Sequence, residues 1–188
     1  CAIHTDERLV DVELAAAYGT SRMPAREALM RLVAEGFLVG TTRGFTLPVL
    51  SLQDIRDIFG VRRLLEPDAA ADAARHIDDA AMRELEAALR QARYSVEHDD
   101  TGQMILANMG FRDVWLSRVT NPRLADTIAR FVDHVQTVRL ATLSNPPTRQ
   151  VVVDGLEGLY EVLRKRDAAR TRVRMRAFLL AAENAFFS

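Results

Sequence analysis

Cysteine is almost absent from this sequence of 188 residues, which contains a single cysteine, at position 1. A disulfide bond within the chain is therefore excluded, and the composition fits the reducing cytoplasm. No apolar run approaches the roughly 18 residues of a membrane-spanning helix, so we expect no membrane partner. A Gly-rich phosphate loop, a Ser or Cys nucleophile beside a base, and paired inward carboxylates are also missing. The sequence thus gives no indication of an enzyme.

The pattern that is present near the N-terminus is a helix, a tight turn and a second helix. Gly19 can adopt the positive φ that ends the first helix, and the Ser21 hydroxyl can cap the second. Pro24 falls in the first turn, where its missing N–H costs nothing. Arg22 and Arg26 lie four residues apart near the start of this helix, as groups that contact phosphates or guanine edges in a major groove would. The opposite side is predicted to be a buried stripe of Ala25, Ala28, Leu29, Leu32 and Val33.

The flanking segments decide how the arginine pair is interpreted, since an isolated pair is more often a solvated helix edge. Residues 9–18 form a short helix with Leu14 and Ala15 on its apolar side. Residues 36–39 then alternate as a strand does, turn at 41–44 and return through 45–49. Helix, turn, helix and β-hairpin together predict a winged helix-turn-helix DNA-binding domain over residues 1–50.

Several segments, in order and without gaps, resemble the GntR family of bacterial transcription regulators: Leu14-Ala15, Ser21-Arg22-Met23-Pro24-Ala25-Arg26-Glu27-Ala28-Leu29, Leu32, Glu35-Gly36 and Arg43-Gly44-Phe45. The resemblance implies that Ser21, Arg22 and Arg26 contact operator DNA. It also implies that Arg43 and Gly44 bring the hairpin tip to the minor groove. The family begins with another helix and turn before the position of Leu9, so we expect a further N-terminal stretch before Cys1.

Excess positive charge is also lacking. The net charge is −1, and residues 1–50 contain five Arg against six Asp plus Glu. The arginines lie on the predicted contact face, whereas the carboxylates of Asp6, Glu7, Asp11 and Glu13 lie upstream of it. We therefore expect modest nonspecific affinity for DNA, with a homodimer doubling the specific contacts.

Residues 51–188 lack any strand-like alternation, and their apolar residues recur at helical spacing. We predict helices over about 51–76, 79–97, 101–119, 121–144, 149–165 and 168–187, with Asp167 capping the last. Pro67 is expected to kink the first of these or to start a new segment. The fold class is therefore mainly α, a winged helix-turn-helix followed by an antiparallel bundle of about six helices with faces for dimerisation.

This half also resembles a specific domain, the FCD ligand-binding domain of the GntR family. The resemblance rests on Asp54-Ile55, Val61-Arg62-Arg63-Leu64-Leu65-Glu66, Phe111, Asn121-Pro122-Arg123-Leu124 and a closing segment over residues 159–170. By number of helices, it is closer to the shorter, six-helix form of that domain. Many FCD domains bind a divalent metal through one Asp and three His, and the matching positions here are Asn108, Arg112, Leu156 and Phe178. These side chains cannot form that site, so we expect neither a metal nor another cofactor.

The same substitutions suggest a different ligand. Leu156 and Phe178 would form apolar walls, while Asn108 and Arg112, one turn apart, would supply hydrogen-bond donors. A second guanidinium, that of Arg62, and a polar pocket or core group, His134, complete the predicted set. Such a pocket would hold a small organic acid directly by arginine.

Two interpretations of the whole chain remain open. The first is a dimeric DNA-binding transcription regulator that senses a small organic acid without a metal. In the second, Leu156 and Phe178 fill the cavity, Arg112 reaches solvent or an internal carboxylate, and the regulator is controlled by abundance or by a protein partner.

Overall fold

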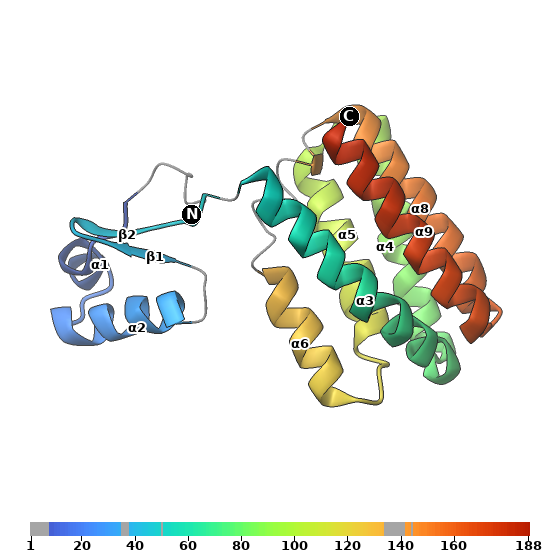
Figure 1. The fold of residues 1–188 in the computed structure, drawn as a ribbon, viewed down its shortest axis with the longest axis horizontal. Helices are drawn as coiled ribbons and strands as arrows, with labels where there is room; N and C mark the ends of the chain where they lie inside the picture. The colour runs from blue at the N-terminus through green and yellow to red at the C-terminus, as the bar shows by residue number, and fades with distance from the viewer. Residues whose placement is uncertain (1–7, 35–37, 50, 134–141, 144) are drawn as a thin grey trace. The chain divides into compact units, whose positions relative to one another are not determined.

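The computed structural model describes residues 8–34, 38–49, 51–133, 142–143 and 145–188. The chain divides into two compact units, Cys1–Ser51 and Leu52–Ser188 (Figure 1). The predicted boundary falls one residue earlier, between residues 50 and 51. Each unit has its own hydrophobic core.

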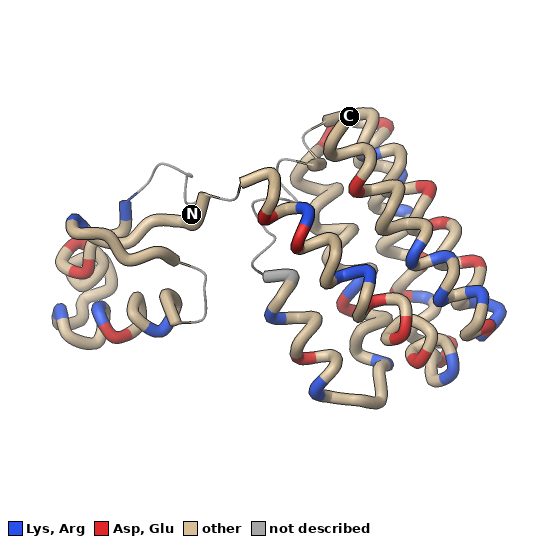
Figure 2. The backbone as a smooth tube through the Cα atoms, viewed as in Figure 1, with Lys and Arg blue, Asp and Glu red and all other residues tan. Residues whose placement is uncertain are grey.

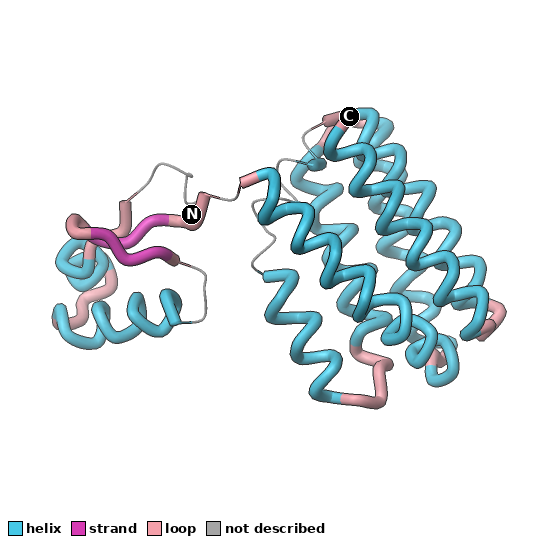
Figure 3. Tube along the Cα trace, viewed as in Figure 1, coloured by secondary structure: helices cyan, strands magenta, loops and turns pink. Residues whose placement is uncertain are grey.

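The N-terminal unit is a helix-turn-helix followed by a β-hairpin (Figure 3), which confirms the predicted fold class; its elements are α1 (Asp11–Ala17), α2 (Arg22–Ala34), β1 (Val39–Thr41) and β2 (Gly44–Thr46). The two strands are antiparallel, with Gly40 opposite Phe45. Leu9 extends the pairing, because its N–H donates to the Phe45 carbonyl at 2.8 Å and its carbonyl accepts from the Phe45 N–H at 2.9 Å.

Two glycines make the turns of this unit possible. Gly19 has φ +60°, and the backbone reverses there, since the Thr20 N–H donates to the Ala15 carbonyl at 2.9 Å. Gly44 has φ +134°, and a Cβ at that position would lie 2.6 Å from the Leu9 carbonyl oxygen. A side chain is therefore excluded at residue 44 both by the backbone conformation and by the paired segment beside it.

The core of this unit is smaller than predicted. Leu29, Leu38 and Phe45 are buried, with Leu14 and Val33 partly buried beside them. In contrast to the predicted stripe, Ala28 and Leu32 are exposed. The physical reason is that the described part of the unit covers only the side of α2 that carries Leu29.

The C-terminal unit is an all-helical bundle whose described helices are α3 (Leu52–His76), α4 (Asp79–Glu97), α5 (Thr101–Leu116), α6 (Pro122–Asp133), α8 (Pro146–Arg164) and α9 (Ala168–Phe187). Helix α3 packs on α9, α9 on α8, α8 on α4 and α4 on α5, while α5 returns to α3 (Figure 1). These contacts close a ring of helices around one core. None of the described helices is long and apolar enough to cross a membrane.

Aspartate caps define where several of these helices begin. The side chains of Asp78, Asp100 and Asp167 accept hydrogen bonds from backbone N–H groups in the first turns of α4, α5 and α9. The predicted cap at Asp167 is thus confirmed. Helix α8 begins three residues earlier than predicted, because Pro146 and Pro147 occupy its first turn, where no N–H is required.

Pro67 does not start a new segment, because α3 continues from Leu52 to His76 with Pro67 inside it. Pro67 is buried, and so are Ala69, Ala70 and Ala73 on the following turns. The free energy gained by packing these turns in the core outweighs the cost of the backbone hydrogen bond that proline removes. The helix predicted over residues 121–144 falls partly outside the described residues, and its described part is α6, Pro122–Asp133.

Candidate DNA-binding surface and effector pocket

The predicted DNA-contacting residues lie in two parts of the N-terminal unit, the start of α2 and the tip of the β-hairpin. Ser21 precedes α2, and Arg22 and Arg26 lie on its first two turns, with side chains 65% and 55% exposed. Arg43 lies in the turn between β1 and β2, where it is exposed, and Gly44 is the first residue of β2. The Arg43 N–H donates to the Thr41 hydroxyl at 3.3 Å, which orders the turn.

Asp11 connects two of the three arginines of α2, Arg22 and Arg26, to α1, although the sequence predicts this carboxylate to lie away from the contact face. Its Oδ2 accepts from Arg22 Nε at 3.1 Å and from Arg26 Nη1 at 3.4 Å, and the residue is only 5% exposed. Burial would raise the pKa of Asp11, but hydrogen bonds from Arg22, Arg26 and the Val12 backbone, together with the charge of Arg22, outweigh it and lower the pKa. The paired residues are 11 and 15 positions apart in the sequence, so no local sequence pattern predicted these contacts.

A cavity of about 70 Å³ lies inside the helical bundle. Five of the six residues predicted to bind a ligand line it, from four different helices: Arg62, Asn108, Arg112, Leu156 and Phe178. The sixth, His134, lies outside the described residues. The volume has room for roughly five to seven water molecules, so Leu156 and Phe178 do not fill the space completely.

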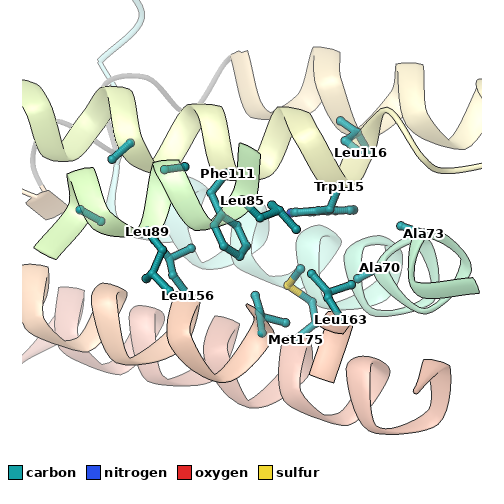
Figure 4. Close-up of a cluster of buried hydrophobic side chains, with 14 of the residues drawn as sticks. Ala70, Ala73, Leu85, Leu89, Phe111, Trp115, Leu116, Leu156, Leu163 and Met175 are labelled. Atoms are coloured by element: carbon teal, nitrogen blue, oxygen red, sulfur yellow. The ribbon is translucent and has the colours of Figure 1, made fainter. Parts of the chain in front are cut away.

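The cavity wall is mainly apolar and partly aromatic. Its apolar lining includes Phe59, Phe111, Trp115, Val152, Leu159 and Met175. Figure 4 shows Phe111 and Trp115 of α5 in the core, with Leu156 of α8 and Met175 of α9 on the other side of the bundle. Such a wall favours a ligand with an apolar body.

A buried ion pair forms the polar side of the cavity on α3. Arg62 Nε donates to Glu66 Oε1 at 2.6 Å, and Arg62 Nη2 donates to Oε2 at 3.3 Å. The Glu66 side chain is 3% exposed and that of Arg62 is 18% exposed. The sequence analysis did not assign Glu66 to the site, although a spacing of four residues from Arg62 on one helix is the signal for such a pair.

The opposite polar group comes from α5. Arg112 follows Asn108 by one helical turn, and both residues line the cavity. The Arg112 side chain is 11% exposed, with Nη2 3.6 Å from Asp113 Oδ1, and Asp113 itself is 62% exposed. The Asp113 carboxylate therefore lies mostly in solvent, while most of Arg112 lies within the protein.

Arg149 holds part of the cavity wall in place. It is 3% exposed at the start of α8, and its Nη1 donates to the Thr101 hydroxyl at 2.6 Å and to the Leu143 carbonyl at 3.2 Å. Nη2 of the same guanidinium pairs with Asp99 in the turn before α5. Since Leu143 lines the cavity, Arg149 ties this wall to α5 and α8.

Acidic and basic residues are interspersed along the helices rather than separated by sign (Figure 2). Within the described ranges, no group of three or more His, Cys, Asp or Glu side chains is placed to hold a metal ion.

A winged helix-turn-helix joined to a helical bundle with an internal pocket defines a class of bacterial regulators with separate DNA-reading and ligand-binding units. The chain belongs to the GntR family of this class, with an FCD domain. The profile of bacterial regulatory proteins of the gntR family matches residues 3–47, and that of the FCD domain matches residues 57–181. Members of this family are transcriptional regulators and not enzymes.

Curated relatives agree with this assignment. The Nta operon transcriptional regulator of Aminobacter aminovorans is 34% identical over 141 residues, which cover 71% of this chain and 63% of that protein. The transcriptional regulator McbR of Escherichia coli is 32% identical over 128 residues, or 68% of this chain and 58% of that protein. The chain thus spans less than two thirds of the length of both relatives.

Solved structures share the fold. The structure of E. coli McbR/YncC superposes with a TM-score of 0.83 and 24% identity, covering 98% of this chain and 89% of that one. A putative GntR regulator from Rhodococcus sp. RHA1 gives a TM-score of 0.76 and 20% identity, covering 96% and 86%. At this level of identity, the likeness concerns the fold alone.

Proposed function

We propose that this chain is a DNA-binding transcriptional regulator whose helical unit senses a small organic acid without a metal. The observation that carries the proposal is the convergence of Arg112 and Asn108 with the apolar side chains of Leu156 and Phe178 on one cavity. An arginine beside an apolar wall suits a carboxylate with an apolar body. The family and the fold support the DNA-binding part.

DNA recognition rests on Ser21, Arg22 and Arg26 in the major groove and on Arg43 and Gly44 in the minor groove. A homodimer would present these groups twice to a two-fold symmetric operator. Because the net charge is −1, affinity depends on where the arginines lie rather than on a strongly basic surface. The place of action is the cytoplasm, where such an operator is found.

Ligand binding regulates operator binding only if the acid has different affinities for two states of the dimer. The ligand contacts would come from α3, α5, α8 and α9, so an acid in the cavity would contact four of the five helices that form the ring. A ligand of this kind therefore has a direct physical route to change how the bundle packs.

The test begins by selecting an operator from a random duplex library at low salt. A thermal-shift screen then compares wild type and Arg112→Ala against small carboxylates, metals and a chelator. We expect a carboxylate that raises the melting temperature of wild type only and that changes operator affinity. If the protein retains no duplex from the library, the proposal that it binds DNA is wrong. If no carboxylate acts, the filled-pocket alternative replaces acid sensing, and stabilisation by zinc or nickel contradicts the metal-free site.

Replacing Asp11 with Asn is expected to weaken binding to the selected operator by about tenfold, since the negative charge that attracts both arginines and one of the two acceptor oxygens are lost. Binding to a scrambled duplex should not fall, because the protein has lost a negative charge. Fluorescence anisotropy titrations with both duplexes measure this selectivity.

Glu13→Gln is the matched control, because it removes an exposed carboxylate of the same helix. Equal losses on both duplexes for Asp11→Asn would show that Asp11 serves the stability of the unit and not the placement of Arg22 and Arg26.

A further inference from the structure

The segment before α1 brings one more arginine to the β-hairpin. Leu9 pairs with Phe45 in the antiparallel direction, through backbone hydrogen bonds of 2.8 and 2.9 Å. This direction places Arg8 opposite Thr46, two residues along β2 from Gly44. The Arg8 side chain is exposed. It does not belong to the predicted set of DNA-contacting residues.

The side chain of Arg8 extends along the hairpin toward its turn. A Cβ at Gly44 would lie 3.2 Å from Cγ and 3.4 Å from Cδ of Arg8. Diagonal neighbours on paired strands are within reach of long side chains, as this contact requires. The aliphatic part of Arg8 therefore lies beside Gly44. Its guanidinium begins at the next atom, so it lies close to the turn that carries Arg43.

The absence of a side chain at Gly44 permits this arrangement. A Cβ there would press on Cγ of Arg8 as well as on the Leu9 carbonyl oxygen, which would be 2.6 Å away. Arginine commonly lays its aliphatic stem along a protein surface and keeps its charged end in water. Because the stem is already packed, the guanidinium has less conformational freedom to lose when it binds an anion.

We propose that Arg8 is a further DNA-contacting residue, and that it binds a phosphate at the edge of the minor groove that receives the hairpin tip. The inference rests on the proposed function, since it adds a contact to the same DNA-binding surface. Arg43 lies in the turn itself, whereas Arg8 reaches the hairpin from the neighbouring segment and lies beside the tip. The minor groove is only about 6 Å wide, so a cation beside an inserted tip meets the phosphates that border the groove.

A phosphate contact has three properties that can be measured. It adds affinity without sequence preference, because the phosphates are the same in every duplex. It releases a bound counterion, so it makes binding more dependent on salt. Lysine can replace arginine in it, because a positive charge within reach is sufficient, whereas the planar fork of an arginine that reads bases is not replaced by lysine.

The experiment measures the salt dependence of DNA binding by the full chain. Fluorescence anisotropy titrations compare wild type, Arg8→Gln and Arg8→Lys on the selected operator and on a scrambled duplex, at salt concentrations from about 50 to 300 mM. The glutamine keeps part of the aliphatic stem beside Gly44 and removes the charge. The lysine keeps the charge and removes the planar fork.

We expect Arg8→Gln to weaken binding to both duplexes by a similar factor, at least about tenfold at low salt. The slope of the logarithm of the binding constant against the logarithm of salt concentration should become shallower by about 0.9 per protomer. Arg8→Lys should retain the wild-type slope and most of the affinity. A merely structural role of Arg8 would leave the slope unchanged.

Arg31→Gln is the matched control, because Arg31 is an exposed arginine near the C-terminal end of α2 and its replacement changes the net charge equally. We expect its salt slope to stay close to that of wild type, since an arginine away from the phosphates releases no counterion. If Arg31→Gln changes the slope as much as Arg8→Gln does, the effect comes from net charge and the contact by Arg8 is wrong.

The remaining outcomes separate this inference from the proposed function. A wild type that binds neither duplex overturns DNA binding together with the role of Arg8. If wild type binds and Arg8→Gln has an unchanged slope, or loses affinity for the operator alone, the phosphate contact is overturned and DNA binding stands. Failure of Arg8→Lys to retain the wild-type slope also overturns the phosphate contact, and this comparison holds even where Arg8→Gln fails to fold.

Discussion

The double variant Arg22→Ala/Arg26→Ala should lose selective operator binding by at least about a hundredfold. A good bidentate contact between an arginine and a base is worth about 1–3 kcal/mol, and a dimer makes each contact twice. Both side chains are more than half exposed, so the substitutions remove little packing from the core around Leu29. Anisotropy titrations with the selected operator and a scrambled duplex would measure the loss.

Arg31→Ala is the matched control for this experiment. Arg31 is an exposed arginine of the same helix, near its C-terminal end, and its removal lowers the net charge by the same amount per site. We expect a small loss on both duplexes, caused by the charge alone. If Arg31→Ala weakens operator binding as much as Arg22→Ala or Arg26→Ala does alone, α2 binds DNA through its overall charge and not through the first two turns.

Gly155→Ala is expected to lower the free energy of unfolding of the helical unit by about 1–3 kcal/mol, the usual cost of overpacking. A Cβ at Gly155 would lie 2.0 Å from Cδ2 and 2.8 Å from Cγ of Phe178, so the ring rests directly on the backbone of α8. The ring cannot move aside as a flexible chain end would, because its Cγ is also too close. Since Phe178 lines the cavity, its displacement should also weaken acid binding. Urea denaturation and calorimetry measure the two effects.

Two other helical glycines provide controls for the same substitution. A Cβ at Gly110 of α5 meets nothing within 4 Å, so Gly110→Ala should stabilise the unit by about 1 kcal/mol through helix propensity. At Gly158 the three atoms nearest to the Cβ would all belong to the Arg174 guanidinium, the end of a flexible side chain that can move, and we expect little change. Adding Phe178→Leu to Gly155→Ala should recover much of the loss. Destabilisation by all three alanines alike would contradict the explanation by close packing.

Local chemistry explains which features were predictable from the sequence. Gly19 and Gly44 indicated turns because few other residues adopt a positive φ, and Asp167 indicated a helix start because its carboxylate can accept a backbone N–H. The bounds of α4 followed from the regular apolar spacing of residues 79–97, and the structure adds a cap by Asp78. Pro67 shows the limit of this reasoning, since the buried alanines after it keep α3 continuous.

The sequence by itself determined the order of helices, turns and hairpin, the assignment to the GntR family with an FCD domain, and the set of residues expected around a pocket. These properties depend on residues that are close in the chain or on an ordered motif. Only the tertiary structure decided that Asp11 joins Arg22 and Arg26, that Ala28 and Leu32 remain exposed, and that Glu66 faces the same cavity as Arg112. These properties depend on contacts between distant segments and on which side of each helix is covered, and both are set by the packing of the whole unit.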